Sequence, residues 1–377
     1  MPVRLRKSDG AVFVLALILY LATMFSESPF NEQVRQAYAF LHGHVQIDAP
    51  AFLEHAQVGP YSYALHPPLA PILLMPFVAI WGMNTNQTIC SVLIAAAGVM
   101  LAWTLFKGLE LPTEECAWLT LFFGMGTIFW YEGAVGTTWA LPILTCAVFL
   151  LATLIELFGL NRPLWIGIWG ASACLARYDA VLVMPVIAAL SWHKGRTISE
   201  MLWIAPAFLV VGVFFVWLNE VRFNSFFDQG LEYIPNVAHG RWSGIQYVPG
   251  NLYTLLFMAP RGDGTFPYFH PVFTGQALTL TSPAFVLALR PSFKRLEVSA
   301  MGLCAALIAI PSLVHSTNGF SQFGARFYIQ TYPFLLVMMA MGMPPKTDQL
   351  TKILVVTSMV LVAFGVWHVH EWGLAGP

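Results

Sequence analysis

Apolar residues along the 377-residue chain gather into long runs, and short polar connections separate these runs. A helix that crosses a bilayer needs about 20 predominantly apolar residues. The pattern therefore predicts an all-α, polytopic integral membrane protein with about 11–12 transmembrane helices. The candidate spans are approximately 11–27, 67–83, 88–107, 115–131, 138–159, 163–177, 179–192, 200–219, 276–290, 297–314, 327–344 and 352–370.

Two long polar segments interrupt this series, a first loop at 27–66 and a second at 220–275. The first loop holds Val34, Ala37 and Phe40 at a helix-like spacing, which predicts an amphipathic helix lying on the outer leaflet. No tandem repeat or linker divides the chain. The sequence thus predicts a single transmembrane domain over 1–377, with both loops on its outer side.

Composition agrees with a membrane protein, because 58% of the residues are hydrophobic and only 10% are charged. A soluble domain has about 25% charged residues. The formal net charge of −1 gives no reason to expect nucleic acid as a partner. Basic residues in the N-terminal segment and in short connections, which face the cytoplasm by the positive-inside rule, orient the chain. These connections carry Arg162, 193–196, 290–295, Lys346 and Lys352.

The number of spans conflicts with this orientation. Five candidate runs lie between the N-terminus and Arg162, although both ends are predicted to be cytoplasmic. Either one run within 67–159 does not cross the membrane, or a basic connection lies outside.

Four carboxylates near the predicted outer surface are candidates for acid–base chemistry: Glu32, Asp48, Glu54 and Glu132. Glu32 lies shortly after the first span, Asp48 follows the expected interfacial helix, and Glu132 follows an apolar run. A carboxylate held at the membrane surface is partly desolvated, which raises its pKa and suits it to act as a general base.

The segment His66-Pro67-Pro68 opens an apolar run. Proline suits the first turn of a helix, whose free N–H groups and partial positive charge favour an anion. His66 adds either a hydrogen-bond donor or a cation, so a phosphate is one expected ligand. The alternative is an ordinary helix start with a histidine cap.

Two arginines also lie at predicted helix ends on the outer side, Arg177 and Arg326. Guanidinium groups match phosphate and carboxylate geometry. The two arginines are therefore candidate phosphate ligands, together with Tyr328. For Arg177, a structural ion pair with Asp179 or Glu132 is an equal alternative. Tyr328 is also explained as an interfacial anchor.

No cofactor is predicted with certainty. A divalent metal held by Glu54 and His55 is a weak alternative, because their spacing with other histidines fits no compact metal motif.

The order of these motifs resembles the membrane glycosyltransferases of the GT-C fold that use polyprenyl-phosphate sugars, in particular the protein-mannosyltransferase-like group and its bacterial lipid-modifying relatives. The resemblance spans most of the chain. Each motif alone is weakly specific, and their order and spacing together are more so. The matching stretches are 31–33, 39–43, 61–69, 176–179, 257–262 and 323–328.

The resemblance implies an enzyme that moves a sugar from a polyprenyl-phosphate donor to a hydroxyl of a lipid, glycan or protein acceptor, by inverting attack assisted by a carboxylate base. It implies an active site on the extracytoplasmic side of a plasma membrane, as in a prokaryotic cell. Arg261, Asp263 and His270 are then expected on the acceptor side.

Two departures from the family pattern stand out. Relatives often carry Asp-Glu where this chain has Asn31-Glu32, so the base is Glu32 or Asp48. Relatives often carry Lys where this chain has His66. A lipid or polysaccharide transporter or flippase, or a non-catalytic GT-C-like scaffold, remains as an alternative. One-sided clustering of the polar residues and the absence of repeated halves favour the enzyme over the transporter.

Overall fold

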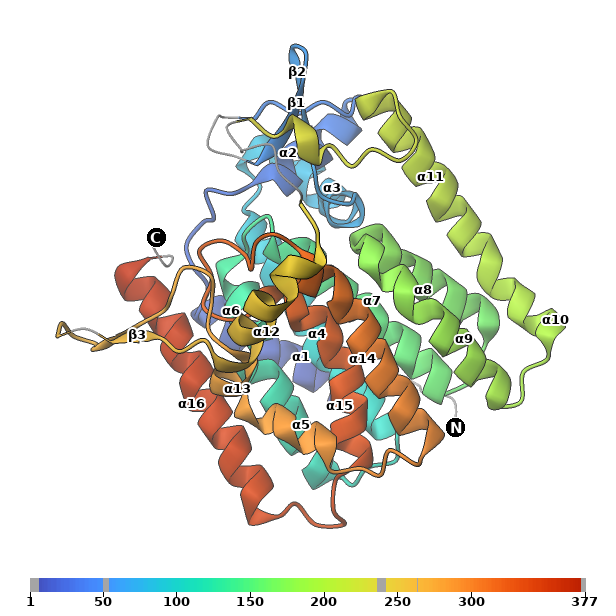
Figure 1. The fold of residues 1–377 in the computed structure, drawn as a ribbon, viewed down its shortest axis with the longest axis vertical. Coiled ribbons are helices and arrows are strands. Elements are labelled where there is room, and N and C mark those ends of the chain that lie inside the picture. The colour runs from blue at the N-terminus through green and yellow to red at the C-terminus, as the bar shows by residue number, and fades with distance from the viewer. Residues whose placement is uncertain (1–6, 50–53, 236–241, 263, 374–377) are drawn as a thin grey trace.

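Helices make up about 69% of the structure, and the strands of the described residues form two short hairpins (Figure 1). The computed structural model describes residues 7–49, 54–235, 242–262 and 264–373. Its α-helices are α1 (Lys7–Ala22), α2 (Glu32–Leu41), α3 (Leu69–Trp81), α4 (Gln87–Gly108), α5 (Thr113–Met125), α6 (Ile128–Val135), α7 (Ala140–Phe158), α8 (Pro163–Ala176), α9 (Met184–His193), α10 (Ile198–Met201), α11 (Ala205–Phe223), α12 (Val248–Phe257), α13 (Leu278–Thr281), α14 (Leu296–Val314), α15 (Tyr332–Met341) and α16 (Gln349–Trp372).

Short 3-10 helices extend several of these elements, and the strands pair in sequence order. The 3-10 helices are η1 (Gly82–Asn84), η2 (Tyr178–Val183), η3 (Leu202–Ile204), η4 (Leu231–Tyr233), η5 (Ile245–Tyr247), η6 (Pro283–Leu289) and η7 (Arg326–Thr331). The strands are β1 (His55–Val58), β2 (Tyr61–Ala64), β3 (Arg261–Gly262) and β4 (Phe269–His270). Antiparallel pairs join β1 to β2 and β3 to β4.

The sequence-based expectation of apolar spans is confirmed in its general form. Five helical segments of the described residues are long and apolar enough to cross a membrane: Gln87–Gly108, Ala140–Phe158, Ile198–Phe223, Leu296–Val314 and Gln349–Trp372. Shorter apolar helices pack among them. In α11 almost every side chain faces outward, as expected for a helix in contact with lipid.

Helices α4 and α7 lie at the centre of the bundle, with α1 against α4 and α8 against α7. The turn from α6 into α7 depends on Gly136, which ends α6 with a φ of +63° in the left-handed region. A Cβ at this position would lie 2.6 Å from Cα of Thr88. Only glycine allows α4 to approach so closely, and this contact fixes the start of α7.

Helix α3 begins and ends on the same face of the bundle. It follows β2 directly, and the chain then enters α4 beside the end of α1, where Asn86 Nδ2 donates to Ser26 O at 2.9 Å. Gln87 Nε2 donates to the carbonyls of Phe30 and Gly136 on that face. The 67–83 run therefore returns to its starting face, and excluding it from the spans removes the conflict in the count.

The first loop contains the expected helix, but its surroundings differ from the prediction. The apolar side of α2 packs through Val34 and Ala37 against Ala70 and Leu74 of α3. It therefore contacts protein rather than the outer leaflet. The loop also forms the β1–β2 hairpin, which turns at Gly59 and Pro60. The sequence-based prediction did not include this hairpin, although Gly-Pro is a turn signal.

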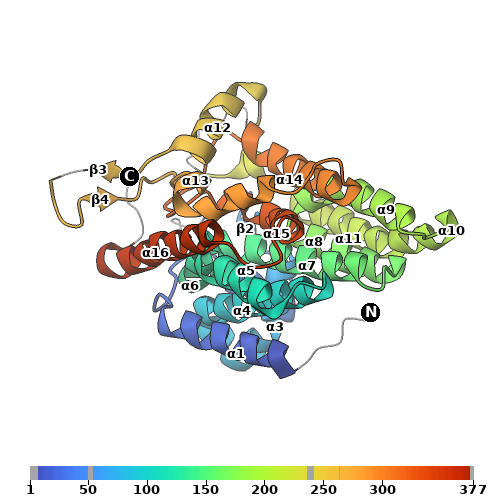
Figure 2. The ribbon, with the colours of Figure 1, turned by 90° about the horizontal axis from the view of Figure 1, so that it is seen from below.

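The opposite face gathers the ends of α4, α7, α9 and α15 and the starts of α5, α8, α14 and α16 (Figure 2). Several of its basic residues form ion pairs, among them Arg162 with Glu156 at 2.7 Å, Arg290 with Asp348 at 3.0 Å and Lys352 with Glu114 at 3.0 Å.

A buried arginine of α11 holds the β1–β2 hairpin to the bundle. Arg222 is 3% exposed, its Nη1 donates to Ala64 O at 2.7 Å, and its Nη2 donates to Asn219 Oδ1 at 2.9 Å. We expect Arg222→Met to lower the free energy of unfolding by about 2–3 kcal/mol, because charged hydrogen bonds contribute about 1.5–3 kcal/mol. Denaturant titration measures this loss, and limited proteolysis near Gly59 should accelerate. If neither the free energy of unfolding nor the rate of proteolysis changes, Arg222 does not hold the hairpin to the bundle.

Candidate functional site

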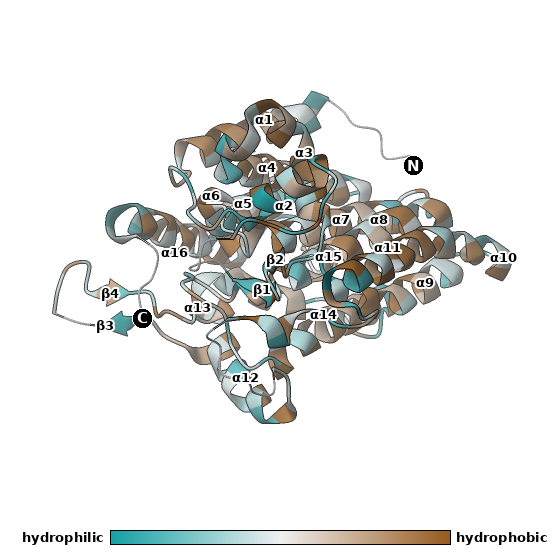
Figure 3. Ribbon diagram, turned by 90° about the horizontal axis from the view of Figure 1, so that it is seen from above, coloured by the Kyte–Doolittle hydropathy of each residue, from teal (hydrophilic) through white to brown (hydrophobic). Residues whose placement is uncertain are grey.

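Polar residues gather on the face that carries α2 and the β1–β2 hairpin. Figure 3 views this face from above, where hydrophilic residues of α2 and β1 lie near the centre, with more apolar helices around them. We define the polar cluster as Glu32, Glu54, His66, Glu132, Arg177, Asp179 and Arg326. These residues come from six separate segments of the chain.

Glu32 begins α2 and is fully buried, and neither of its carboxylate oxygens has a hydrogen-bond partner. Burial, with a smaller contribution from the nearby charge of Glu54, raises the pKa of this carboxyl from 4.5 to about 7. The Thr138 hydroxyl and backbone N–H groups approach the carboxylate and oppose part of this shift, but their geometry falls short of a hydrogen bond. Gln33 Nε2 holds Thr138 in place through two 3.1 Å bonds. Glu32 is thus prepared to accept a proton near neutral pH.

Glu54 and Trp139 connect the carboxylates to the cations. Trp139 Nε1 donates to Glu54 Oε2 at 2.7 Å, and its ring lies between those of Phe30 and Phe320. The Arg326 guanidinium carbon lies 5.0 Å from the centre of the same ring, within cation–π range. The sequence marked Glu54 as a candidate for acid–base chemistry and as a weak metal ligand. It did not mark Trp139, because no local motif brings the two residues together.

Arg326, the first residue of η7, is among the largest fully buried side chains of the structure. Its Nε has no hydrogen-bond partner, and no ion pair of its guanidinium occurs among the described residues. Glu132 of α6 lies within electrostatic range and has an unpartnered Oε1 of its own. A buried cation without hydrogen-bonded partners costs several kcal/mol in a folded protein. Arg326 therefore points to an anionic ligand.

His66 lies between β2 and α3, where its Nε2 is buried without a partner. Burial lowers its pKa to about 4, and the charges of Arg177 and Arg326 act in the same direction, while Glu54 opposes them. The imidazole is therefore neutral at pH 7. Of the two roles open at the sequence level, the structure favours a hydrogen-bond donor over a cation. The helix start itself is as expected, since α3 begins at Leu69 directly after the two prolines.

Arg177 has an ion-pair partner, because its Nη2 lies 2.9 Å from Asp179 Oδ2. Gln330 Nε2 of η7 also donates to Asp179 Oδ2, at 3.0 Å, and so joins η7 to η2. This is the ion pair that the sequence left open. His315 lies close to this pair, and burial lowers its pKa. Arg177 keeps part of its guanidinium for another partner, but Arg326 is the stronger candidate for an anion.

The other predicted site residues lie apart from the polar cluster or make no recorded contact with it. Asp48 is exposed, and its backbone carbonyl accepts from Arg35 Nη1 at 2.6 Å. Arg261 is exposed on β3, and His270 of β4 contacts His368 of α16. Asp263 lies outside the described residues. Tyr328 is buried in η7, and its hydroxyl has no partner.

His55 is buried at the start of β1, beside Glu54 in sequence. Among the residues that the structure describes, no group of three or more His, Cys, Asp or Glu side chains is placed to hold a metal ion.

Comparison of the chain with protein-family models, with curated proteins and with solved structures finds no match.

Proposed function

We propose that the chain is a membrane glycosyltransferase of GT-C-like architecture that transfers a sugar from a polyprenyl-phosphate donor to an acceptor hydroxyl on the extracytoplasmic side. The observation that carries the proposal is the presence, on one face, of a buried carboxylate without a hydrogen-bond partner, Glu32, and of a buried guanidinium, Arg326, whose Nε has none. The charge of Glu54 acts on both groups. A base and an anion-binding group in one water-poor site are what displacement of a lipid phosphate requires.

The proposed orientation places the polar cluster outside and the N-terminus in the cytoplasm. An odd number of passages then crosses the membrane, formed by α1, α4, α5–α6, α7, α8, η2–α9, α10–α11, α13–η6, α14, η7–α15 and α16. Arg162, Arg290 and Lys352 fall on the cytoplasmic side, in accord with the positive-inside rule. The polyprenyl chain of the donor lies in the bilayer against these helices.

In the proposed reaction, Glu32 removes the proton of the acceptor hydroxyl as its oxygen bonds to the anomeric carbon. The bond from this carbon to the phosphate oxygen breaks with inversion, and the lipid phosphate leaves with the electron pair. Arg326 offsets the charge that develops on the leaving phosphate, and His66 donates a hydrogen bond to it. Such preorganised donors usually make the largest contribution to a rate.

The test is turnover of a labelled polyprenyl-phosphate sugar by the purified protein in lipid nanodiscs. Because Glu32 acts as a base with a pKa of about 7, we expect kcat/KM to rise between pH 5 and pH 8 with a midpoint near 7. Lack of transfer with every donor and acceptor class would refute the enzyme and favour the scaffold. A rate that falls across this pH range would reject Glu32 as the base.

Stability should change with pH in the opposite direction. The pKa of Glu32 is higher in the folded chain than its ordinary value of 4.5, so the folded state binds the proton more tightly. This contribution to stability is complete below pH 4.5 and is lost as pH rises through about 7.

A further inference from the structure

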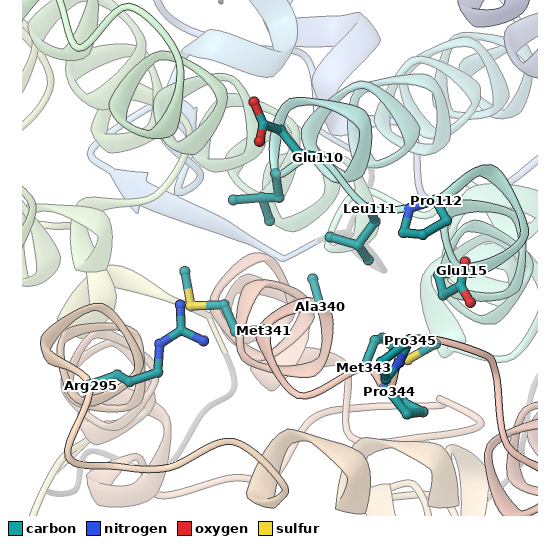
Figure 4. Close-up of a pocket in the computed structure, with 11 residues that line it drawn as sticks. Glu110, Leu111, Pro112, Glu115, Arg295, Ala340, Met341, Met343, Pro344 and Pro345 are labelled. Atoms are coloured by element: carbon teal, nitrogen blue, oxygen red, sulfur yellow. The ribbon is translucent and has the colours of Figure 1, made fainter.

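A cavity of about 340 Å³ lies at the end of the bundle remote from the polar cluster (Figure 4). The connection between α4 and α5 forms one wall, and the end of α15 with the following prolines forms another. Arg295, just before α14, completes the lining. We call it the basal pocket. The proposed transfer reaction uses none of its residues.

A buried carboxylate lines this pocket without a full set of partners. Glu115 in the first turn of α5 is 2% exposed, and its Oε2 has no hydrogen-bond partner. Its Oε1 receives only a long bond of 3.5 Å from the Thr347 hydroxyl. A buried carboxylate in this state is costly unless a cation or a strong donor joins it. The exposed Glu110 adds a second carboxylate to the lining.

A cation lies across the pocket from this carboxylate. In Figure 4, Arg295 and Glu115 stand on opposite sides of Ala340 and Met341. No ion pair of the Arg295 side chain occurs within the described residues. The pocket therefore offers a negative end and a positive end, separated by apolar side chains.

The walls between these two ends are apolar and adaptable. Leu111, Pro112, Met343 and Pro344 contribute hydrocarbon and thioether surface, which suits methylene groups and ester carbons. The pocket also lies where several apolar helices end, beside the basic residues Arg290 and Lys352. In a membrane-embedded chain this is the depth of lipid head groups.

We propose that the basal pocket binds the head group of a zwitterionic aminophospholipid, of the phosphoethanolamine type. The primary ammonium group donates to the unpartnered Oε2 of Glu115, and the phosphate pairs with Arg295. The glycerol backbone contacts the apolar wall, and the acyl chains remain in the bilayer. A quaternary ammonium has no N–H to donate, so a phosphocholine head group leaves Glu115 unbonded.

The experiment measures retained lipid by native mass spectrometry, with the full chain released from nanodiscs that hold equal amounts of phosphatidylethanolamine and phosphatidylcholine of identical acyl chains. We expect at least a tenfold preference for phosphatidylethanolamine in the wild type. In Glu115→Gln the preference should fall to within about twofold, and Arg295→Gln should retain less of both lipids. Glu297→Gln, outside the pocket lining, is the matched control and should behave as wild type.

Equal retention of the two lipids by the wild type would overturn the proposal. So would an unaltered preference in Glu115→Gln. If Glu115→Gln does not fold, the lipid preference of the wild type and the lipid retention of Arg295→Gln still test the proposal. Free phosphoethanolamine that displaces the lipid at equal concentration would reject the lipid as ligand in favour of a soluble one. The readout does not depend on sugar transfer, so its failure leaves the proposed reaction untouched.

Discussion

Replacing Glu32 by Gln is expected to lower kcat for sugar transfer by at least a hundredfold. General-base catalysis contributes about a hundredfold to ten-thousandfold, and an amide oxygen cannot take up the acceptor proton. The substitution preserves size in a fully buried position, so the fold should persist. It also removes the buried ionisable group, and we therefore expect Glu32→Gln to exceed the wild type in stability at pH 8. Steady-state rates and denaturant titrations at pH 5 and pH 8 measure both effects.

Asp48→Asn provides the matched control, since it changes the alternative carboxylate of the same loop. Asp48 is exposed, and its backbone carbonyl accepts from Arg35. Among the described residues its side chain forms no hydrogen bond or ion pair with the polar cluster. Its kcat should stay within about twofold of wild type. The assignment of the base is wrong if Glu32→Gln keeps full activity, or if Asp48→Asn is the variant that loses it.

Arg326→Met is expected to reduce kcat/KM for the lipid-phosphate donor by about a hundredfold to a thousandfold, the usual effect of removing one preorganised donor. It should not destabilise the ligand-free protein. Among the described residues the wild-type guanidinium forms no hydrogen bond or ion pair, so methionine of similar length removes a costly buried charge. We expect a free energy of unfolding equal to or higher than that of wild type.

Comparison with Arg222→Met separates an effect on stability from an effect on donor binding. Both arginines are almost fully buried, but Arg222 forms two hydrogen bonds within the protein, whereas Arg326 forms none among the described residues. Arg222→Met should therefore lose stability, and Arg326→Met should lose donor binding. Added polyprenyl phosphate should raise the thermal midpoint of the wild type and leave Arg326→Met unaffected. Equal stabilisation of both would show that the phosphate binds elsewhere.

The helices were predictable because long apolar runs leave few alternatives, and the start of α3 followed from its prolines. Glu32 and Arg326 also stood out, since charges next to apolar runs are rare. The bond between Trp139 and Glu54 was not predictable, because it joins residues 85 positions apart. The protonation of His66 was equally inaccessible, since it depends on burial and on arginines from distant elements.

The return of α3 has a consequence for how the chain enters a membrane. Its sequence is as apolar as that of the helices that cross, so insertion machinery that responds to hydrophobicity alone would thread it through. In the proposed orientation, every later helix would then be inverted, and Arg162 would lie outside with the basic connections that follow it. The contacts of α3 with α2 prevent this only once both helices are made. In the proposed orientation the topology would therefore be fixed by packing between neighbours, after more than eighty residues have been synthesised.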